Sequence, residues 1–345
     1  QAVNYTRRAP LGVVGCISPW NLPLYLLTWK IAPALATGNC VIAKPSEITP
    51  YTAFLLSELI IEAGLPAGVL NILHGRGAVI GQLIVQHEEV KAISFTGGTE
   101  TGRLIGKLAA EQFKKASLEL GGKNPVMVFD DCDFEEAVTT SVKSAFTNQG
   151  EICLCGSRIF VQNSIFERFK ESFVKQVNDL TVGDPKEDVN LGPLVSDQHL
   201  QKVEQFVESA RSEGAEILTG GKRLDQEGYY YLPTVIAGLD EYCEINQEEV
   251  FGPVVTLVPF EDEADAIAKA NSTNYGLAAV IWTNDLKRAH RVAHQVQAGI
   301  IWVNCWMLRD LRTPFGGMKS SGVGREGGND ALRFFTEPQN ICIKL

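Results

Sequence analysis

Residues 92–102 read AISFTGGTETG and join an apolar strand pattern to a helix through a turn that contains paired glycines. Glycines at such a turn let the backbone approach a phosphate, and a helix start offers N–H donors and a favourable dipole. The stretch therefore predicts a strand, a tight turn and a helix, the unit of nucleotide-binding α/β sheets. It lacks the G-x-G-x-x-G pattern and is a weak signal for nucleotide binding by itself, because an ordinary glycine turn with threonine caps is common.

The same alternation continues on both sides of this stretch. Apolar runs predict strands, and helix periodicity separates them; the strands fall at residues 11–17, 40–43, 69–73, 92–95 and 117–120, and the helices at 22–37, 50–63, 77–86 and 100–114. This order predicts a doubly wound parallel sheet, a Rossmann-like α/β layout.

A second α/β series follows Gly121-Gly122, a glycine pair that marks a boundary between two units. Its predicted strands lie at residues 125–129, 157–162, 253–259, 278–283 and 299–303, and its helices at 133–147, 164–179, 196–213, 262–271 and 285–296. Residues 341–345 read as a lone strand, and a strand without a neighbour is a candidate for sheet extension within an oligomer.

Composition narrows the class of protein. The 345 residues, 45% hydrophobic and 21% charged, are typical of a globular chain with room for two domains. The net charge of −10 argues against nucleic acid and anionic membrane surfaces as partners. No apolar window could span a bilayer and no signal layout is present, so we expect a cytoplasmic chain. The eight cysteines and five histidines lack zinc-site spacing, so we expect no metal.

Polar residues stand out where the second strand of the predicted sheet ends. Lys44 and Glu47, in Val41-Ile42-Ala43-Lys44-Pro45-Ser46-Glu47, follow the second strand, at the edge where such sheets bind ligands. A carboxylate there accepts hydrogen bonds from ribose hydroxyls and repels a 2′-phosphate, which favours NAD over NADP. A solvated Lys/Glu turn is the alternative.

Two further residues have the chemistry of an active site. Glu119 lies inside an apolar strand, where burial raises a carboxyl pKa towards the range of a general base. Asn21, between two prolines, could donate its amide N–H to a developing oxyanion. The alternatives are an exposed edge-strand glutamate and a turn or helix-cap asparagine.

A candidate nucleophile lies in NQGEICLCGSR, residues 148–158, where a glycine-marked turn joins a helix to a strand. A thiol at such a junction can point into a cleft, and its thiolate is a strong nucleophile. Cys153 and Cys155 could equally be small buried apolar residues.

Seven motifs occur in order along nearly the whole chain: PWNLP, KPSE, FTGGTETG, LELGGKNP, NQGEICLCGSR, EEVFGPV and PFGGMKSSGVGRE. Together they resemble the NAD(P)-dependent aldehyde dehydrogenase superfamily, and ISPWNLPLYLLTWKIAPAL and ICLCGSR are most similar to its 2-aminomuconic and 2-hydroxymuconic semialdehyde branch.

The resemblance implies a catalytic set and a cofactor. It matches Cys153 with the nucleophile, Glu119 with the general base, and Asn21 and the Cys153 backbone N–H with the oxyanion donors, and it makes Cys155 structural. The cofactor is NAD, and the cofactor-binding residues that it implies are Ile17, Ser18, Pro19, Trp20, Lys44, Ser46, Glu47, Gly77, Gly81, Phe95, Thr96, Gly97, Gly98, Thr101, Leu120, Gly121, Glu249 and Phe251.

The resemblance also suggests a substrate class. Arg309 and Arg312 fall in the segment that lines the aldehyde entrance of the family, and an arginine there could bind a substrate carboxylate with two parallel hydrogen bonds. We expect a semialdehyde with a distal acid group. The alternative is a solvated loop in which one of these arginines pairs with Asp310.

The expected domains are an NAD-binding domain at 1–120, a catalytic domain at 121–322, and a return to the cofactor domain with an oligomerisation strand at 323–345. Residues 1–9 resemble the end of the family's inter-subunit arm, and the fold is expected to be incomplete at its N-terminus. We expect a homo-oligomer, a dimer or tetramer. A truncated, non-catalytic structural member of the family is the competing expectation, because the support that precedes Asn21 in the family is absent.

Overall fold

The computed structural model describes residues 1–345, and they form two compact units. The first comprises Gln1–Leu120, Asp310–Gly316 and Gly322–Leu345, and the second comprises Gly121–Arg309 and Gly317–Ser321. The chain therefore crosses between units after Leu120, and the second unit ends at Ser321, next to the boundary expected at residue 322. Residues 310–316 also belong to the first unit. The sequence did not predict this, because that segment has no regular secondary structure and therefore no periodic pattern.

The first unit contains a six-stranded sheet in the order β14-β6-β5-β2-β3-β4. All neighbours are parallel except β14, which runs antiparallel to β6. The strands are β2 (Val13–Ile17), β3 (Cys40–Lys44), β4 (Leu70–Ile72), β5 (Val90–Thr96), β6 (Lys115–Glu119) and β14 (Gly322–Val323).

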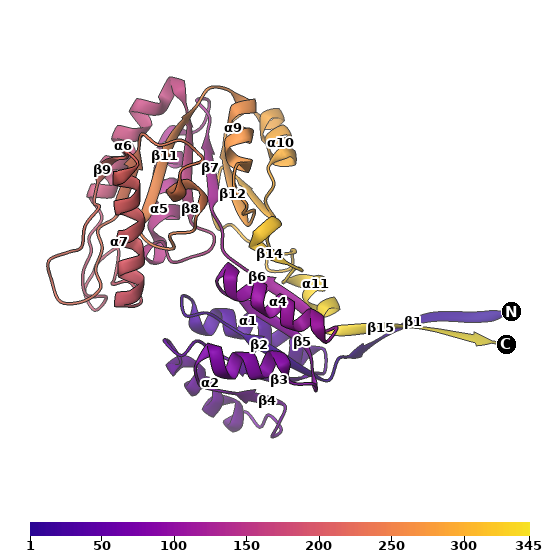
Figure 1. The fold of residues 1–345 in the computed structure, drawn as a ribbon. Helices are drawn as coiled ribbons and strands as arrows, with labels where there is room; N and C mark the ends of the chain where they lie inside the picture. The colour runs from indigo at the N-terminus through magenta and orange to yellow at the C-terminus, as the bar shows by residue number, and fades with distance from the viewer. The chain divides into compact units, whose positions relative to one another are not determined.

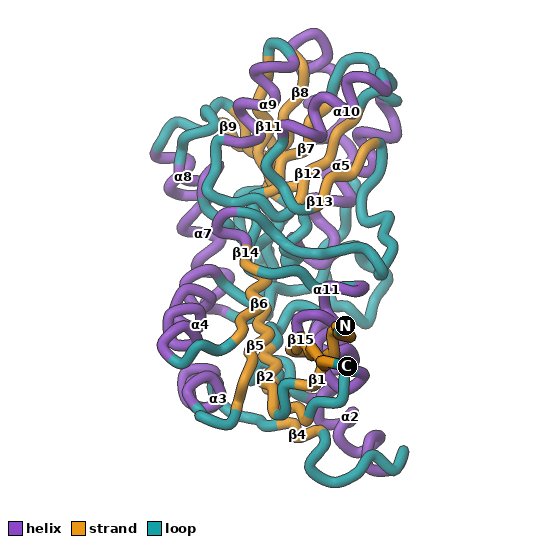
Figure 2. The backbone as a smooth tube through the Cα atoms, turned by 90° about the vertical axis from the view of Figure 1, so that its right-hand side faces the viewer, coloured by secondary structure: helices purple, strands orange, loops and turns teal.

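Helices cover both faces of this sheet. Helices α3 and α4 lie on one side of the sheet (Figure 2). They pack there through Ile84 and Ile105, and α1 packs on the other face through Leu27 and Ile31. Pro23 starts α1, where its missing N–H costs nothing. The helices are α1 (Pro23–Ala36), α2 (Tyr51–Glu62), the π-helical turn η1 (Gly77–Gly81), α3 (Gln82–Gln86), α4 (Thr99–Glu111) and α11 (Gly328–Phe334).

The second unit contains a seven-stranded sheet in the order β13-β12-β7-β8-β11-β10-β9, parallel except for the pair β10 and β9. Its strands are β7 (Asn124–Val128), β8 (Gly156–Gln162), β9 (Glu216–Thr219), β10 (Thr234–Ala237), β11 (Val254–Phe260), β12 (Ala278–Trp282) and β13 (Ile300–Val303). The sequence patterns missed β9 and β10, which are only four residues long and flanked by polar loops.

Helices α5, α7, α9 and α10 of the second unit begin at aspartate or serine caps. Asp133 caps α5 and Ser196 caps α7, each by accepting a backbone N–H of the first turn. Phe169, Phe173 and Val177 recur at every fourth position of α6 and are buried. These helices are α5 (Phe134–Phe146), α6 (Phe166–Asn178), α7 (Asp197–Ser212), α8 (Glu244–Gln247), α9 (Glu263–Asn271) and α10 (Leu286–Gln295); the 3₁₀ segments are η2 (Thr147–Gly150), η3 (Asn163–Ile165) and η4 (Lys319–Ser321).

The two chain ends pair with each other (Figure 1). Strand β1 (Ala2–Pro10) runs antiparallel to β15 (Thr336–Lys344), with Ala2 opposite Lys344 and Pro10 opposite Thr336. The expectation of a lone C-terminal strand is therefore wrong, because β15 has a partner within the chain. The pairing joins residues more than 300 positions apart, which no local pattern reveals. The α/β fold class with parallel sheets is confirmed. No helix combines the length and the apolar composition needed to cross a membrane.

Candidate functional site

The cofactor residues expected in the first unit gather at one edge of its sheet. Ile17, the last residue of β2, lies opposite Lys44 of β3 and Phe95 of β5, and Thr96 lies opposite Glu119. Because these strands are parallel, the segments that follow them leave the sheet on the same side. The segments are Ser18–Trp20, Pro45–Glu47 and Gly97–Gly98.

Lys44 and Glu47 form an ion pair at that edge. The buried Lys44 Nζ lies 2.9 Å from Oε2 of the exposed Glu47, and Glu47 Oε1 accepts the N–H of Gly77 at 3.1 Å. Burial alone would raise the pKa of Glu47, but the hydrogen bonds from Lys44 and Gly77 lower it to about 2. The carboxylate is thus charged at every physiological pH and held in place as an acceptor. Nearby, Gly81 lies against the aliphatic part of the Lys44 side chain.

The glycine turn after β5 is open on one side. A Cβ on Gly97 would lie 2.4 Å from the Phe95 ring, so that position requires glycine for packing. Gly98 has an ordinary φ of −68° and nothing within 4 Å of a Cβ, so nothing in the protein itself requires its glycine. Space beside the N-terminus of α4 fits a phosphate approached by the backbone.

Other expected cofactor residues surround this turn. The hydroxyls of Ser18 and Thr96 are buried without a hydrogen-bond partner in the protein, as expected for groups that lie against a ligand. Ser46 is buried and accepts the N–H of Ile48, Thr101 is exposed on α4, and the backbone carbonyl of Trp20 accepts from Thr49. Pro19 is half-buried, and Leu120 is buried against Gly102.

Asn21 lies in the loop between β2 and α1 and is half-buried. The loop is short and fixed on both sides, by Pro19 and by Pro23 at the start of α1. Its side chain is therefore held at the carboxyl end of β2, and it belongs to the first unit together with Glu119.

Glu119 ends β6 with its carboxyl group buried. The residue is 3% exposed, and neither carboxyl oxygen has a hydrogen-bond partner in the protein. Burial and the nearby Glu326 raise the pKa of Glu119 well above its usual value, and Lys30 and Arg325 only partly oppose this. The exposed edge-strand alternative is therefore wrong. A carboxyl group with a raised pKa and open acceptor positions has the properties of a general base.

A buried polar cluster that sequence patterns missed accounts for part of this environment. Lys30 Nζ lies 2.5 Å from Glu326 Oε1 and 3.2 Å from Ser94 Oγ, and Ser94 Oγ donates to the same carboxylate at 3.0 Å. A small cavity in the first unit is lined by all three side chains and by Ser117, whose buried hydroxyl has no partner. A lysine inside the apolar helix pattern 22–37 was the available signal.

The segment before Cys153 has an unusual backbone. Asn148, Gln149 and Gly150 all have positive φ, at 51°, 57° and 73°, and two of them are not glycine. A Cβ on Gly150 would lie 2.1 Å from the carbonyl oxygen of Gly252, so glycine is required there. Left-handed residues in succession indicate a loop whose shape is imposed by its surroundings, a common feature of functional sites.

Cys153 and Cys155 differ as expected from the resemblance. Cys153 is half-buried, while Cys155 is 6% exposed and burial raises the pKa of its thiol to about 12. Nδ2 of Asn124 donates to both backbone carbonyls, at 2.7 Å and 2.9 Å, and fixes the loop that carries the two thiols. Cys155 is thus inert, and Cys153 is the reactive candidate of the pair.

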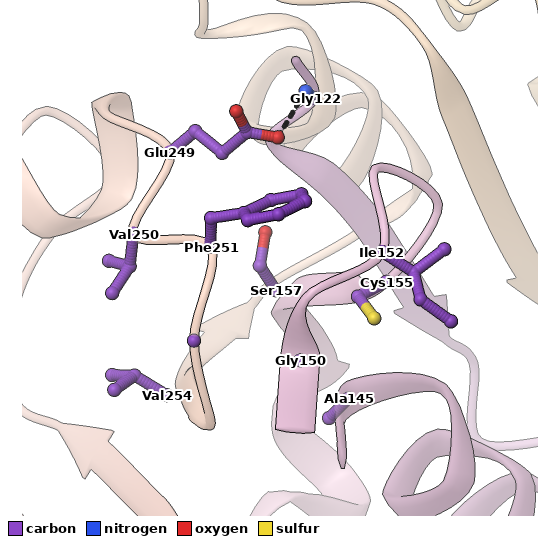
Figure 3. Close-up of a pocket in the computed structure, with 11 residues that line it drawn as sticks. Gly122, Ala145, Gly150, Ile152, Cys155, Ser157, Glu249, Val250, Phe251 and Val254 are labelled. Carbon is purple, nitrogen blue, oxygen red and sulfur yellow. Dashed lines mark hydrogen bonds between the residues drawn. The ribbon is translucent and has the colours of Figure 1, made fainter. Parts of the chain in front are cut away.

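Glu249 and Phe251 lie on one side of a small cavity in the second unit, opposite Gly150 and Cys155 (Figure 3). Oε1 of Glu249 accepts the N–H of Gly122 at 2.8 Å. A Cβ on Gly121 would lie 2.2 Å from Glu249 Oε2, so the glycine pair makes room for this carboxyl group.

The two loop arginines lie in different environments. Arg312 is highly exposed, and its guanidinium donates three hydrogen bonds to the Asp310 carboxylate, the shortest at 2.7 Å. Asp310 raises the pKa of Arg312, so the two charges stabilise each other. Arg309 is half-buried. The pairing with Asp310 that the sequence left open as an alternative is present for Arg312.

The expected catalytic and cofactor residues are divided between the two units. The first unit holds Asn21, Glu119 and the Lys44–Glu47 pair, and the second holds Cys153, Glu249 and Phe251.

Comparison with known proteins identifies the same family that the sequence motifs resemble. The aldehyde dehydrogenase family model matches residues 1–341. A 2-aminomuconic semialdehyde dehydrogenase of Danio rerio is 51% identical over 350 residues, which cover 99% of this chain and 72% of that protein. A 2-hydroxymuconic semialdehyde dehydrogenase of Pseudomonas putida is 48% identical over 351 residues, covering 100% and 72%.

Comparison with solved structures supports the same family. Betaine aldehyde dehydrogenase of Staphylococcus aureus in complex with NAD+ superposes with a TM-score of 0.96 at 43% identity, covering 99% of this chain and 69% of that one. HpcC of Thermus thermophilus gives 0.97 at 45% identity, covering 99% and 68%. The chain belongs to the aldehyde dehydrogenase family.

Proposed function

We propose that this protein oxidises a semialdehyde that carries a distal carboxylate to the corresponding acid, with NAD as cofactor. The observation that carries the proposal is Glu119, whose carboxyl group is buried, has no hydrogen-bond partner in the protein and has a raised pKa. A group of this kind is costly to maintain unless it serves chemistry. Family membership supports the reaction type.

The proposed roles follow from the chemistry of each side chain. The Cys153 thiolate adds to the aldehyde carbon, and the oxygen that becomes negative accepts hydrogen bonds from the Asn21 amide and the Cys153 backbone N–H. When bound, NAD supplies the hydride acceptor for the oxidation, after which the substrate is attached to Cys153 as a thioester. Glu119 takes a proton from the water that attacks the Cys153 thioester, and this attack releases the acid and regenerates the thiolate.

The proposed cofactor residues fit NAD. The charged Glu47, held by Lys44 and Gly77, provides a ribose acceptor, and the open side of Gly98 gives a phosphate access to the start of α4. Glu249 and Phe251 are proposed as contacts to the nicotinamide ribose. The residues proposed to complete the set are Ile17, Ser18, Pro19, Trp20, Ser46, Gly77, Gly81, Phe95, Thr96, Gly97, Thr101, Leu120 and Gly121.

The substrate class rests on two supports. Relatives that are about half identical are named 2-aminomuconic and 2-hydroxymuconic semialdehyde dehydrogenases, and Arg309 and Arg312 lie in the loop after β13. We propose Arg309 as the main carboxylate partner, because it is half-buried whereas Arg312 is highly exposed and binds Asp310. We also propose that the protein is a homo-oligomer, which light scattering of the purified protein would test. We propose the cytoplasm as its location.

The reaction is tested by following NADH absorbance with a carboxylated semialdehyde, next to Cys153→Ala and Glu119→Gln variants. We expect turnover for the wild type and none for Cys153→Ala. Glu119→Gln should give one burst of NADH without turnover, because the thioester forms but is not hydrolysed. Equal NADH formation by wild type and Cys153→Ala would disprove the proposal.

The arginine roles need paired substrates. Arg309→Ala and Arg312→Ala are compared with the wild type on a carboxylated aldehyde and on a neutral one of the same length. We expect Arg309→Ala to raise KM for the carboxylated aldehyde alone by about tenfold, the size of one lost charged hydrogen bond. Equal losses on both substrates would exclude a role in carboxylate recognition.

A further inference from the structure

Helix α7 holds the loop that carries Glu249 and Phe251 through two backbone carbonyls. Nε2 of His199 lies 2.6 Å from the carbonyl oxygen of Phe251, and Nζ of Lys202 donates to the carbonyl oxygen of Glu249 at 3.1 Å. His199 and Lys202 are three residues apart, so they lie on one face of the helix. Two contacts from one helix face to alternate carbonyls fix both the position and the direction of the loop.

Phe251 has a backbone conformation that needs such support. Its φ is 58°, in the left-handed region that side chains larger than glycine rarely adopt. The following residue, Gly252, also packs tightly, since a Cβ there would lie 2.6 Å from Val203 of α7. Helix α7 therefore contacts both the carbonyl group of the strained Phe251 and the residue that follows it.

The loop that carries Cys153 reaches the same histidine. Oε1 of the buried Glu151 lies 3.6 Å from His199 Nε2 and accepts the N–H of Val195, just before α7, at 3.2 Å. Gly150 and Gly252 are in close contact, and Figure 3 shows both loops around one cavity. His199 thus lies where the nucleophile loop and the Glu249–Gly252 loop meet α7.

Burial sets the charge states of these groups. It lowers the pKa of His199 and raises the pKa of Glu151 to about 8, so at neutral pH the imidazole is neutral and the carboxyl is mainly protonated. Since a carbonyl can only accept, Nε2 of His199 carries the proton in this tautomer. The contact is a hydrogen bond between neutral groups and does not depend on an ion pair with Glu151.

We infer that His199 and Lys202 are positioning residues that hold Glu249 and Phe251 in the geometry needed for the cofactor, and that Glu151 links this support to the Cys153 loop. The inference rests on the proposed function, because it assumes that Glu249 and Phe251 contact bound NAD. It predicts that a change on α7, away from the reacting atoms, alters both cofactor binding and the reactivity of Cys153.

The test uses the full chain with His199→Ala, His199→Gln and Lys202→Met, and Gln198→Ala as a matched control at an exposed position of the same helix. The measurements are NAD affinity by calorimetry, the iodoacetamide alkylation rate of Cys153 by peptide mass spectrometry, steady-state kcat and KM, and Tm. We expect His199→Ala to weaken NAD binding about tenfold and to change the alkylation rate severalfold, the range for one lost buried hydrogen bond. His199→Gln keeps an N–H donor and should recover most of both, which a loss through general unfolding would not allow.

The outcomes separate this inference from the proposed function. NAD affinity and alkylation rate within twofold of Gln198→Ala in both His199→Ala and Lys202→Met would overturn the inference, even if the wild type oxidises aldehydes. If the wild type forms no NADH, the proposed function fails, but the alkylation rates still decide the link to Cys153. If His199→Ala does not fold, Lys202→Met carries the test, because it removes the contact to the carbonyl of Glu249. NAD affinity and alkylation rate within twofold of Gln198→Ala in Lys202→Met would then overturn the inference.

Discussion

Nζ of Lys30 lies 2.5 Å from Oε1 of Glu326, and both side chains are buried in the first unit. The pair joins α1 to the segment that precedes α11, and the negative charge of Glu326 is one cause of the raised pKa of Glu119. Electrostatic coupling of this kind makes the protonation of Glu119 sensitive to a residue that need not touch substrate.

Replacing Glu326 with glutamine should therefore change the pH dependence of the reaction. The change removes a negative neighbour of Glu119, which lowers the pKa of Glu119. The base is then deprotonated at lower pH, so the acidic limb of the kcat profile moves to lower pH. An unmoved limb would exclude Glu119 as the titrating base.

The Glu326→Gln variant should also lose about 3–5 kcal/mol of unfolding free energy, because Lys30 is left without its buried ion-pair partner.

The two neighbouring thiols should respond oppositely to substitution. Cys153→Ala should abolish turnover, whereas Cys155→Ala should keep it, because the buried Cys155 thiol has a pKa of about 12 and cannot act as a nucleophile near neutral pH. Peptide mass spectrometry after brief iodoacetamide treatment should find Cys153 alkylated and Cys155 unmodified. Loss of turnover in Cys155→Ala with an unchanged Tm would contradict this assignment.

Local sequence patterns predicted the fold class because strands β2, β3 and β5 are short apolar runs between amphipathic helices. They also pointed to Glu119, since a carboxylate in an apolar strand is conspicuous. The pairs Lys30–Glu326 and β1–β15 join residues about 300 positions apart, and a single sequence contains no information on such contacts. The role of His199 was hidden for a related reason: its partner is a backbone carbonyl, which every residue has.

Replacing Gly98 of the first unit or Gly150 of the second unit with alanine should have different effects on Tm. Gly98→Ala should leave Tm unchanged, because its φ is ordinary and a Cβ meets nothing within 4 Å, yet it should raise KM for NAD if a phosphate occupies that space. Gly150→Ala should lower Tm strongly, because φ is 73° and the Cβ would lie 2.1 Å from Gly252 O. Calorimetric titration with NAD checks the first variant, and unchanged affinity would exclude phosphate binding at Gly98.

Glu151 gives a prediction in which stability, not activity, depends on pH. Burial raises the pKa of Glu151 from an ordinary 4.5 to about 8 in the folded protein. Between these two pH values the unfolded chain has released a proton that the folded chain keeps, so this residue lowers stability as pH rises through the window. Glu151→Gln removes the titration and retains an oxygen to accept the N–H of Val195. The Tm of Glu151→Gln relative to wild type should therefore increase from pH 5 to pH 8.

Thermal unfolding at pH 5, 6.5 and 8 measures this difference, with Glu111→Gln at an exposed position of α4 as the control. The control should shift Tm by the same small amount at every pH, because an exposed carboxylate is solvated in both the folded and the unfolded chain. A Glu151→Gln difference that is equally flat would mean that Glu151 is ionised in the folded protein at neutral pH.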